Sequence, residues 1–175
     1  MNIESGSIIT YSAKYGFRHL VSKPMHYLIQ IFTGSRKHHM GSICNGWYFE
    51  ATKKNDVRKI LFETKLKELS KYVSYEIHPP KRHLTKEQEE SMFINLNNQV
   101  GKKYSALGAF LSILTAALFL SKKKLRTEEW FCSHYSVWSV LKVIDPSSLR
   151  EKNILPREYN PEEALKLFRK IGYIA

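Results

Sequence analysis

The sequence predicts an α+β fold in which a small antiparallel sheet packs against helices. An Asn-Gly pair, Asn45 and Gly46, separates two runs with strand character, and this is the strongest short-range signal for a β-hairpin. Later in the chain, capping patterns at Thr85 and Asn160 predict helices. The 175 residues, 43% of them hydrophobic, can bury a sizeable core, and no repeat or low-complexity linker divides them. We therefore expect a single domain over residues 1–175.

The remaining elements follow from local composition and from turn residues. Pro24 is tolerated in the first turn of a helix and Gly34 ends one, which predicts a helix between them. Pro79 ends a strand, and Pro161 fits the first position of the last helix. In chain order we expect strands over 7–11, 37–44, 47–52, 56–62 and 72–77, and helices over 22–32, 64–71, 86–100, 106–120, 130–141 and from 161 onward.

One long apolar segment stands out. Residues 106–120 form a 15-residue stretch without a charge, and Lys122, Lys123 and Lys124 follow it. The stretch is shorter than the ~20 residues that a bilayer-spanning helix needs. A buried helix is the simpler interpretation, and an arm that dips into lipid beside the flanking lysines is the alternative.

A cysteine stands at the expected start of a helix. Cys132 lies in the first turn of the predicted helix over 130–141, where unpaired backbone N–H groups favour a thiolate over a thiol. Ser133, Ser136 and Ser139 recur at every third position, so one stripe of this helix is small enough to pack closely on a sheet. A structural cysteine in a core helix is the alternative interpretation, because free cysteine is among the most buried residue types.

The predicted hairpin brings a histidine and a glutamate to one face of its ribbon. With a two-residue turn at 45–46, Glu50 faces Gly41 and lies diagonal to His39, within reach of a long side chain. Side chains alternate along a strand, so these positions share a face, whereas His38 and Cys44 fall on the other. The glycine is expected to leave room for the carboxylate to lean toward the imidazole, and Cys44 is expected in the core.

Cys132, His39 and Glu50 match the three roles of a thiol-based catalytic set. A nucleophilic thiol needs a base that accepts its proton and a third group that orients that base. The imidazole would take the thiol proton and later donate it to the leaving group. The carboxylate would fix the ring and stabilise the imidazolium.

Five short motifs stand in a characteristic order along the chain, at 6–9, 32–41, 49–51, 101–104 and 130–133. Their order and spacing resemble the circularly permuted papain-like hydrolases of the NlpC superfamily, the YiiX-like group with relatives in bacteria, phages and poxviruses. In that family the histidine strand precedes the cysteine helix, the reverse of the order in papain. The resemblance implies a permuted papain-like fold and covers the chain from about Gly6 to Lys170.

The resemblance also implies residue roles. The family's H-x-G strand motif falls on His39, its E-A motif on Glu50 and its aromatic-C-S motif on Cys132. Its G-x-x-Y motif ends at Tyr104, which is thereby implied to line the substrate site or to help hold the oxyanion.

Two positions depart from the family pattern. Ser7 stands where the family commonly has an acid, and His134 follows the cysteine by two residues where glutamate or glycine is usual. The imidazole of His134 is either an alternative base or a surface residue. Neither departure removes a member of the catalytic set.

The function expected from these residues is a thiol hydrolase, a cysteine peptidase or amidase that cleaves amide or ester bonds through an acyl-enzyme on Cys132. The resemblance implies cell-wall peptides or lipid acyl groups as substrates. An acyltransferase like the lecithin retinol acyltransferase group is the first alternative. A host-interaction scaffold with little turnover is the second, and the intact His39, Glu50 and Cys132 set argues against it.

Composition restricts the partners and the compartment. The 28 basic and 16 acidic residues give a net charge of +12, which favours anionic surfaces such as membrane lipid or cell wall, although a solvated basic surface is the simpler interpretation. No zinc-ligand spacing, phosphate-binding loop or nucleic-acid signature is present, so we expect no metal, no cofactor and no specific nucleic acid. The two cysteines and the lack of a signal-peptide pattern predict a cytoplasmic location, with membrane association or release as alternatives.

Overall fold

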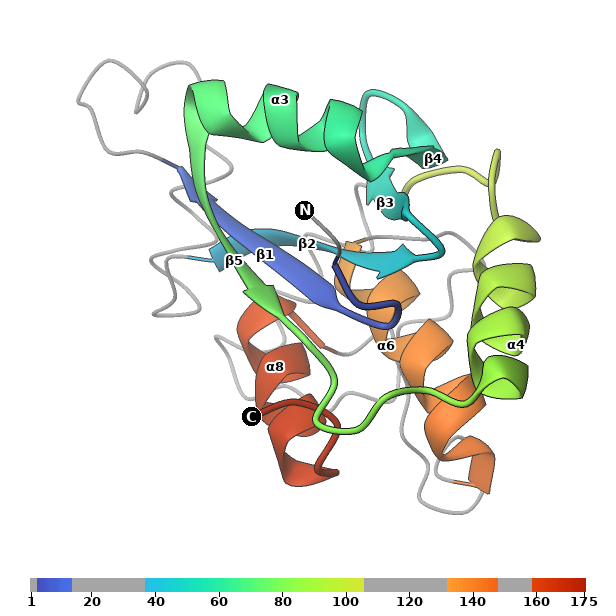
Figure 1. Cartoon of the computed structure of the whole chain (residues 1–175). Coiled ribbons are helices and arrows are strands. Elements are labelled where there is room, and N and C mark those ends of the chain that lie inside the picture. Colours follow the sequence, from blue (N-terminus) through green and yellow to red (C-terminus); the bar gives the residue numbers. More distant parts are fainter. Residues whose placement is uncertain (1–2, 14–36, 106–131, 148–158) are drawn as a thin grey trace.

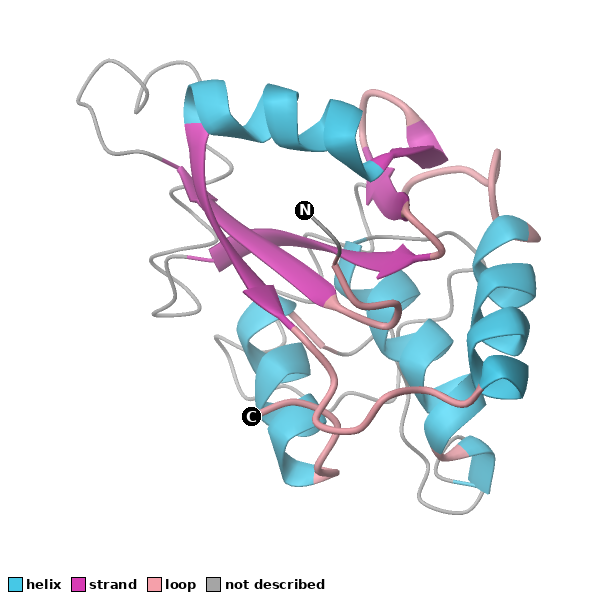
Figure 2. Ribbon diagram, in the orientation of Figure 1, coloured by secondary structure: helices cyan, strands magenta, loops and turns pink. Residues whose placement is uncertain are grey.

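The computed structural model describes residues 3–13, 37–105, 132–147 and 159–175 (Figure 1). Within these residues the chain forms five strands and four helices. The strands make one antiparallel sheet, and the helices pack on its two faces (Figure 2). The predicted α+β class with an antiparallel sheet against helices is therefore confirmed for this part of the chain.

The sheet has the strand order β4-β3-β2-β1-β5, and every neighbouring pair is antiparallel. Each predicted strand in this sheet is found within two residues of its expected bounds. The strands are β1 (Ile8–Ala13), β2 (Lys37–Cys44), β3 (Trp47–Thr52), β4 (Asp56–Leu61) and β5 (Val73–His78).

The hairpin of β2 and β3 has the predicted turn, but its ladder is short. Asn45 and Gly46 both have positive φ, 50° and 73°, as a two-residue hairpin turn of type I′ requires. Pairing keeps the expected register from the turn as far as Ser42 opposite Phe49 and is not continued beyond that pair. The ladder therefore does not include the expected pair of Glu50 and Gly41. On its other edge, β2 pairs with β1, where His39 stands opposite Tyr11. The two strands of the hairpin separate where the site lies.

Helices cover the two faces of the sheet unequally. One face carries α3 (Phe62–Tyr72), and the other carries α6 (Cys132–Ile144) and α8 (Pro161–Lys170), with α4 (Lys86–Asn97) beside α6 (Figure 1). Both predicted capping patterns are present, with Thr85 paired to Gln88 and Asn160 to Glu163. The predicted helices over 22–32 and 106–120, together with residues 130 and 131, lie outside the described residues. No helix among those described is long and apolar enough to cross a membrane.

The sheet separates two hydrophobic clusters. On the α3 side the buried residues are Ile9, Tyr11, Ile43, Tyr48, Phe62 and Leu69. On the α6 side the buried cluster includes Ile8, Met40, Cys44, Phe49, Ala51, Tyr135 and Leu141. The predicted small stripe of α6 is fully buried, because Ser133, Ser136 and Ser139 each have at most 1% of their surface exposed. Cys44 thus lies in the core on the face opposite His39, as expected.

Candidate active site

The N-terminus of α6 meets β2 beyond the end of the hairpin ladder. Cys132 is the first residue of α6, and the backbone N–H of Met40 on β2 hydrogen bonds to its sulfur. The neighbouring β2 residue, His39, also hydrogen bonds to Cys132 through its side chain. The thiol and the imidazole, which lie far apart in the sequence, are therefore in direct contact.

Cys132 is buried, yet the pKa of its thiol is lowered. Only 7% of its surface is exposed, and burial alone would raise the pKa of its thiol. The charge and the hydrogen bond of His39 lower that pKa below its ordinary value, and the backbone N–H groups of Met40 and Ser133 act in the same direction. Because a thiolate is the nucleophilic form of cysteine, this environment prepares Cys132 for attack on an electrophile.

His39 is held between Cys132 and Glu50. Its Nε2 lies 3.0 Å from Oε2 of Glu50, which leaves Nδ1 as the ring nitrogen available to the thiol. Burial alone would lower the pKa of His39, but the negative charge on Cys132 and the contacts with Glu50 raise it to about 9. Each group of the pair thus favours the charged form of the other.

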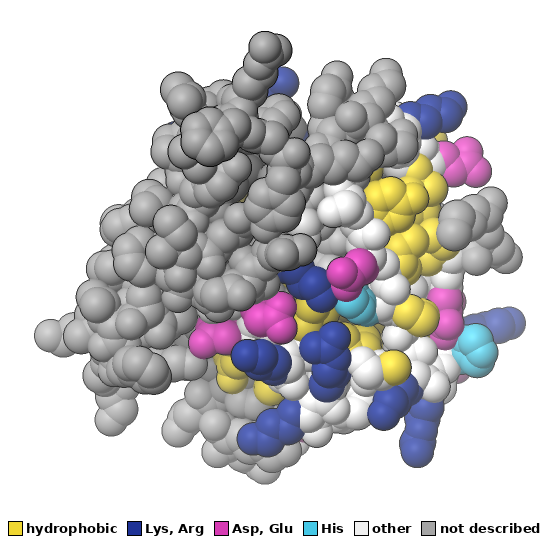
Figure 3. All heavy atoms as spheres, turned by 90° about the vertical axis from the view of Figure 1, so that its left-hand side faces the viewer, with side chains coloured by type: hydrophobic (Ala, Val, Ile, Leu, Met, Phe, Trp, Pro, Cys, Tyr) yellow, Lys and Arg dark blue, Asp and Glu magenta, His cyan; other side chains and the backbone are white. Residues whose placement is uncertain are grey.

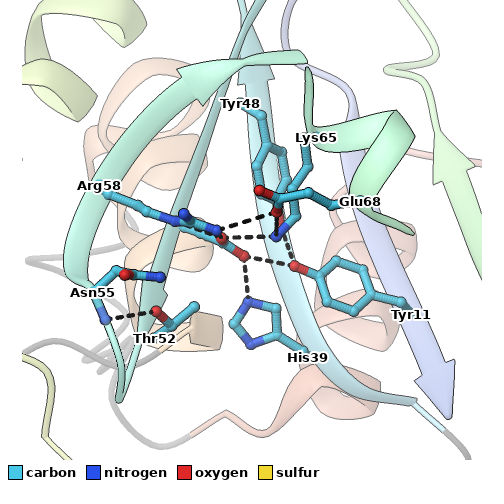
Figure 4. A network of polar contacts seen from close by, with 9 residues as sticks. Tyr11, His39, Tyr48, Thr52, Asn55, Arg58, Lys65 and Glu68 are labelled. Carbon is cyan, nitrogen blue, oxygen red and sulfur yellow. Dashed lines mark hydrogen bonds and ion pairs between the residues drawn. The ribbon is translucent and has the colours of Figure 1, made fainter. Parts of the chain in front are cut away.

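Glu50 is fully buried and holds four partners. Oε2 accepts hydrogen bonds from His39 and, at 2.6 Å, from the Tyr11 hydroxyl, while Oε1 accepts from Arg58 and Lys65 (Figure 4). Burial alone would raise the pKa of this carboxyl, but the hydrogen bond and charge of His39 and the charge of Lys65 hold it well below its usual range. The group is thus an ionised acceptor, so Nε2 of His39 donates to it.

The space next to Gly41 is filled by another side chain than the one expected. A Cβ on Gly41 would clash with the Tyr48 hydroxyl and with the carbonyl of Phe49, 2.6 Å away. The room left by this glycine is therefore filled by Tyr48 and not by the Glu50 carboxylate. The Tyr48 hydroxyl lies 2.7 Å from that of Tyr11, and because Tyr11 donates to Glu50, Tyr48 donates to Tyr11.

Tyr104 also lies at the site. Burial raises the pKa of its hydroxyl, and the charge on Cys132 raises it further, which places the phenol within electrostatic reach of the sulfur. Its backbone N–H donates to Oδ1 of Asp56 at 3.0 Å, at the start of β4. The structure thus brings together Cys132, His39 and Glu50, and Tyr104 is near enough for the charge on Cys132 to affect its pKa.

The two positions that depart from the resembled family's pattern are Ser7 and His134. Ser7 is buried, and its hydroxyl donates to the backbone carbonyl of Glu4 at 2.6 Å. His134 is partly buried in the first turn of α6.

Sequence reasoning missed Tyr11, Arg58 and Lys65, although two signals were available. Lys65 occupies a position in the apolar stripe of α3, three residues after Phe62 and four before Leu69, where a charged residue is unusual. Arg58 stands directly opposite Glu50 across β3 and β4, which is a favourable pairing of opposite charges.

No set of three or more His, Cys, Asp or Glu side chains among the described residues is arranged to hold a metal ion.

Comparison with known proteins bears on the fold. No family model matches the chain, and no curated protein matches it. Among solved structures, five chains match, including the metalloprotein YiiX from Escherichia coli O157:H7, described as a DUF1105 protein. That structure superposes with a TM-score of 0.60 over 94% of this chain and 93% of its own length, at 16% sequence identity. At such identity the similarity establishes a shared fold and carries no residue roles.

Proposed function

We propose that this chain is a thiol hydrolase that cleaves amide or ester bonds through an acyl-enzyme on Cys132. The contact between the buried Cys132 thiol and His39, with Glu50 on the other ring nitrogen, is the observation that carries the proposal. A structural cysteine needs neither a base nor a group that orients the base. Cys44 supplies the contrast within the same molecule, because it lies in the core and its polar partners among the described residues are Glu89 and Ser5.

The reaction would proceed in two halves. The Cys132 thiolate attacks the carbonyl carbon of the substrate, and the His39 imidazolium gives its proton to the departing amine or alcohol, which leaves a thioester on sulfur. Water then attacks the thioester while His39 takes one of its protons, and the thiol leaves as the acid is released. Glu50 holds the ring in place and stabilises the imidazolium.

The permuted papain-like fold of the NlpC superfamily is part of this proposal. Two independent lines support it: the motif resemblance points to the YiiX-like group, and the described fold is similar to that of YiiX itself. The chain order supports it too, because the histidine strand β2 precedes the cysteine helix α6. Tyr104 is proposed to line the substrate site or to hold the oxyanion.

The substrate class is proposed only as a carbonyl compound, with cell-wall peptides and lipid acyl groups as the first to screen. The net charge of +12 favours substrates at anionic surfaces. On the face shown in Figure 3, however, Lys and Arg side chains lie interspersed with Asp and Glu side chains. The proposal therefore relies on the thiol site and not on a basic patch.

Trapping of the acyl-enzyme tests the proposal. We expect reporter esters and amides to add their acyl group to Cys132, as read by intact mass and peptide mapping, and to release it to water. Transfer of the acyl group to an added alcohol or amine in preference to water would identify an acyltransferase. If Cys132→Ala hydrolyses the reporters as fast as the wild type does, or if no carbonyl reagent modifies Cys132, the proposal is wrong.

A further inference from the structure

Lys65 is a buried lysine that faces the site from α3. Only 7% of its side chain is exposed, and its Nζ lies 2.8 Å from Oε1 of Glu50. The ammonium also lies 5.5 Å from the ring centre of Tyr11 and 5.2 Å from that of Tyr48. A lysine normally keeps its charge in water, so this placement needs a compensating partner, and Glu50 is that partner.

Arg58 binds the same oxygen from β4. Its Nε and Nη2 lie 2.9 and 2.5 Å from Oε1 of Glu50. The partners of the carboxylate are therefore divided, with the two cations on Oε1 and the uncharged Tyr11 hydroxyl together with His39 on Oε2. In Figure 4 the Arg58 side chain reaches the network from the left and Lys65 from the upper right, while the His39 ring lies below.

We propose that Lys65 is a positioning residue of the catalytic site, which together with Arg58 holds Oε1 of Glu50 so that Oε2 is directed at the His39 ring. The inference rests on the proposed function of Cys132, His39 and Glu50. It assigns to α3, on the face of the sheet opposite α6, a part in the chemistry at the N-terminus of α6.

The charges of Lys65, Arg58 and Glu50 affect the protonation of His39 and Cys132. Glu50 alone would favour the His39 imidazolium with its full negative charge, and the two cations offset part of that effect. Removal of Lys65 leaves the site more negative, so both His39 and Cys132 should lose their protons at higher pH. Removal of the Glu50 charge should act in the opposite direction.

Other ionisable groups near His39 also affect the pKa values of His39 and Cys132. Among the described residues they include Tyr11 on β1, Glu50 and Tyr48 on β3, Arg58 on β4, Lys65 and Glu68 on α3, Cys132 on α6 and, through Cys132, Tyr104. Glu68 lies 3.6 Å from Arg58 and 3.7 Å from Lys65 and is half exposed, so solvent weakens its effect.

The test is the pH dependence of alkylation at Cys132 in Lys65→Met, with Lys67→Met as the matched control. Both variants remove one positive charge from α3, but Lys67 is exposed. We expect the midpoint of the Cys132 profile to move up by about 0.5 to 1 pH unit in Lys65→Met and to stay in place in Lys67→Met. Glu50→Gln should move the midpoint down.

Opposite shifts of the midpoint in Lys65→Met and Glu50→Gln indicate a charge effect. Structural damage would instead lower the reactivity of Cys132 in both of these variants. If Lys65→Met does not fold, Arg58→Gln decides the matter by the same measurement, with a smaller upward shift expected because Arg58 is 26% exposed. A wild-type profile that depends on His39 but is unchanged in Lys65→Met or Arg58→Gln overturns this inference alone. A wild-type Cys132 that reacts like a free thiol overturns the proposed function and this inference with it.

Discussion

The two cysteines of this chain are both buried, yet their environments have opposite effects on the thiol. Burial raises the pKa of Cys44 to about 12, and the charge of Glu89 adds to that effect. Burial alone would raise the pKa of Cys132 as well, but the His39 charge and hydrogen bond lower it. Cys44 donates to the backbone carbonyl of Glu89 at 3.5 Å, and this hydrogen bond also favours the protonated form. A hydrogen bond with Ser5 lowers the pKa, but by less than burial raises it.

The difference teaches that neither burial nor strand or helix position decides the reactivity of a cysteine. The deciding feature is an imidazole in contact, itself held by a carboxylate that cannot be protonated near neutral pH. Each change below removes one part of that arrangement from Cys132, with Cys44 in the same molecule as an internal reference.

Loss of the nucleophile should have the largest effect. Cys132→Ala is expected to lower hydrolysis of a reporter ester by at least about 1,000-fold, because the acyl-enzyme can no longer form. Cys44→Ala should leave hydrolysis within about twofold of the wild type and cost about 1 kcal/mol of folding free energy for the small cavity that it creates. Initial rates and thermal unfolding of both variants measure this, and comparable rate losses in the two variants would contradict it.

Loss of the base should have the next largest effect. In His39→Ala the Cys132 thiol keeps its burial but loses the imidazolium, so its pKa should return to 8.5 or above, and its alkylation at pH 6.5 should fall about 100-fold. Peptide mass after timed iodoacetamide treatment reports both cysteines at once. Cys44 should be unreactive in both proteins, and an equal change at the two sites would point to loosening of the whole fold.

Glu50→Gln should have a smaller effect on reactivity and a clear effect on stability. The plateau of Cys132 alkylation should fall about tenfold, less than in His39→Ala, because the imidazolium is no longer favoured over the neutral ring. Unfolding in urea at pH 7 should show a loss of about 3 kcal/mol, since Arg58 and Lys65 lose their buried counter-ion.

The free energy of unfolding at low pH tests whether Glu50 is ionised in the folded protein. Because the pKa of Glu50 is lowered by folding, its contribution is present above its ordinary value of 4.5 and is lost as the pH falls toward the lowered value. The Gln variant should therefore lose less stability than the wild type on acidification. Reactivity equal to the wild type in Glu50→Gln would remove Glu50 from the mechanism.

Tyr104→Phe should leave the difference in reactivity between the Cys132 and Cys44 thiols unchanged. The phenol does not supply the charge that lowers the Cys132 pKa, so the alkylation profile should be that of the wild type. If the hydroxyl holds the oxyanion, reporter hydrolysis should fall about 100-fold. A loss of less than about threefold would restrict Tyr104 to lining the site.

Local signals in the sequence were sufficient for much of the fold. The Asn45-Gly46 turn, the capping box at Thr85 and the helix cap at Asn160 are set by residues within a few positions, and the structure confirms them. The turn also fixed which face carries His39 and Glu50, because side chains alternate along strands. The end of the β2–β3 ladder at Ser42 was not predictable, since no local pattern in the sequence marks where a ladder stops.

The candidate site was predictable in part. The order of the motifs suggested that Cys132 and His39 meet, although no local pattern states that two distant segments are in contact. The charge network around Glu50 was missed, because Lys65 is one of many lysines and only its place in the apolar stripe of α3 distinguishes it. Gly41 was explained by the wrong neighbour, because sequence shows that space is free but not which side chain fills it.

The most direct test is the pH dependence of alkylation at both cysteines, in the wild type and in His39→Ala. We expect wild-type Cys132 to react well below the pH of about 8.5 at which a free thiol ionises, to lose that reactivity without His39, and to contrast with a silent Cys44. A Cys132 that is inert, or whose profile is the same with and without His39, would contradict the thiol-imidazole site and leave Cys132 as a structural residue of α6.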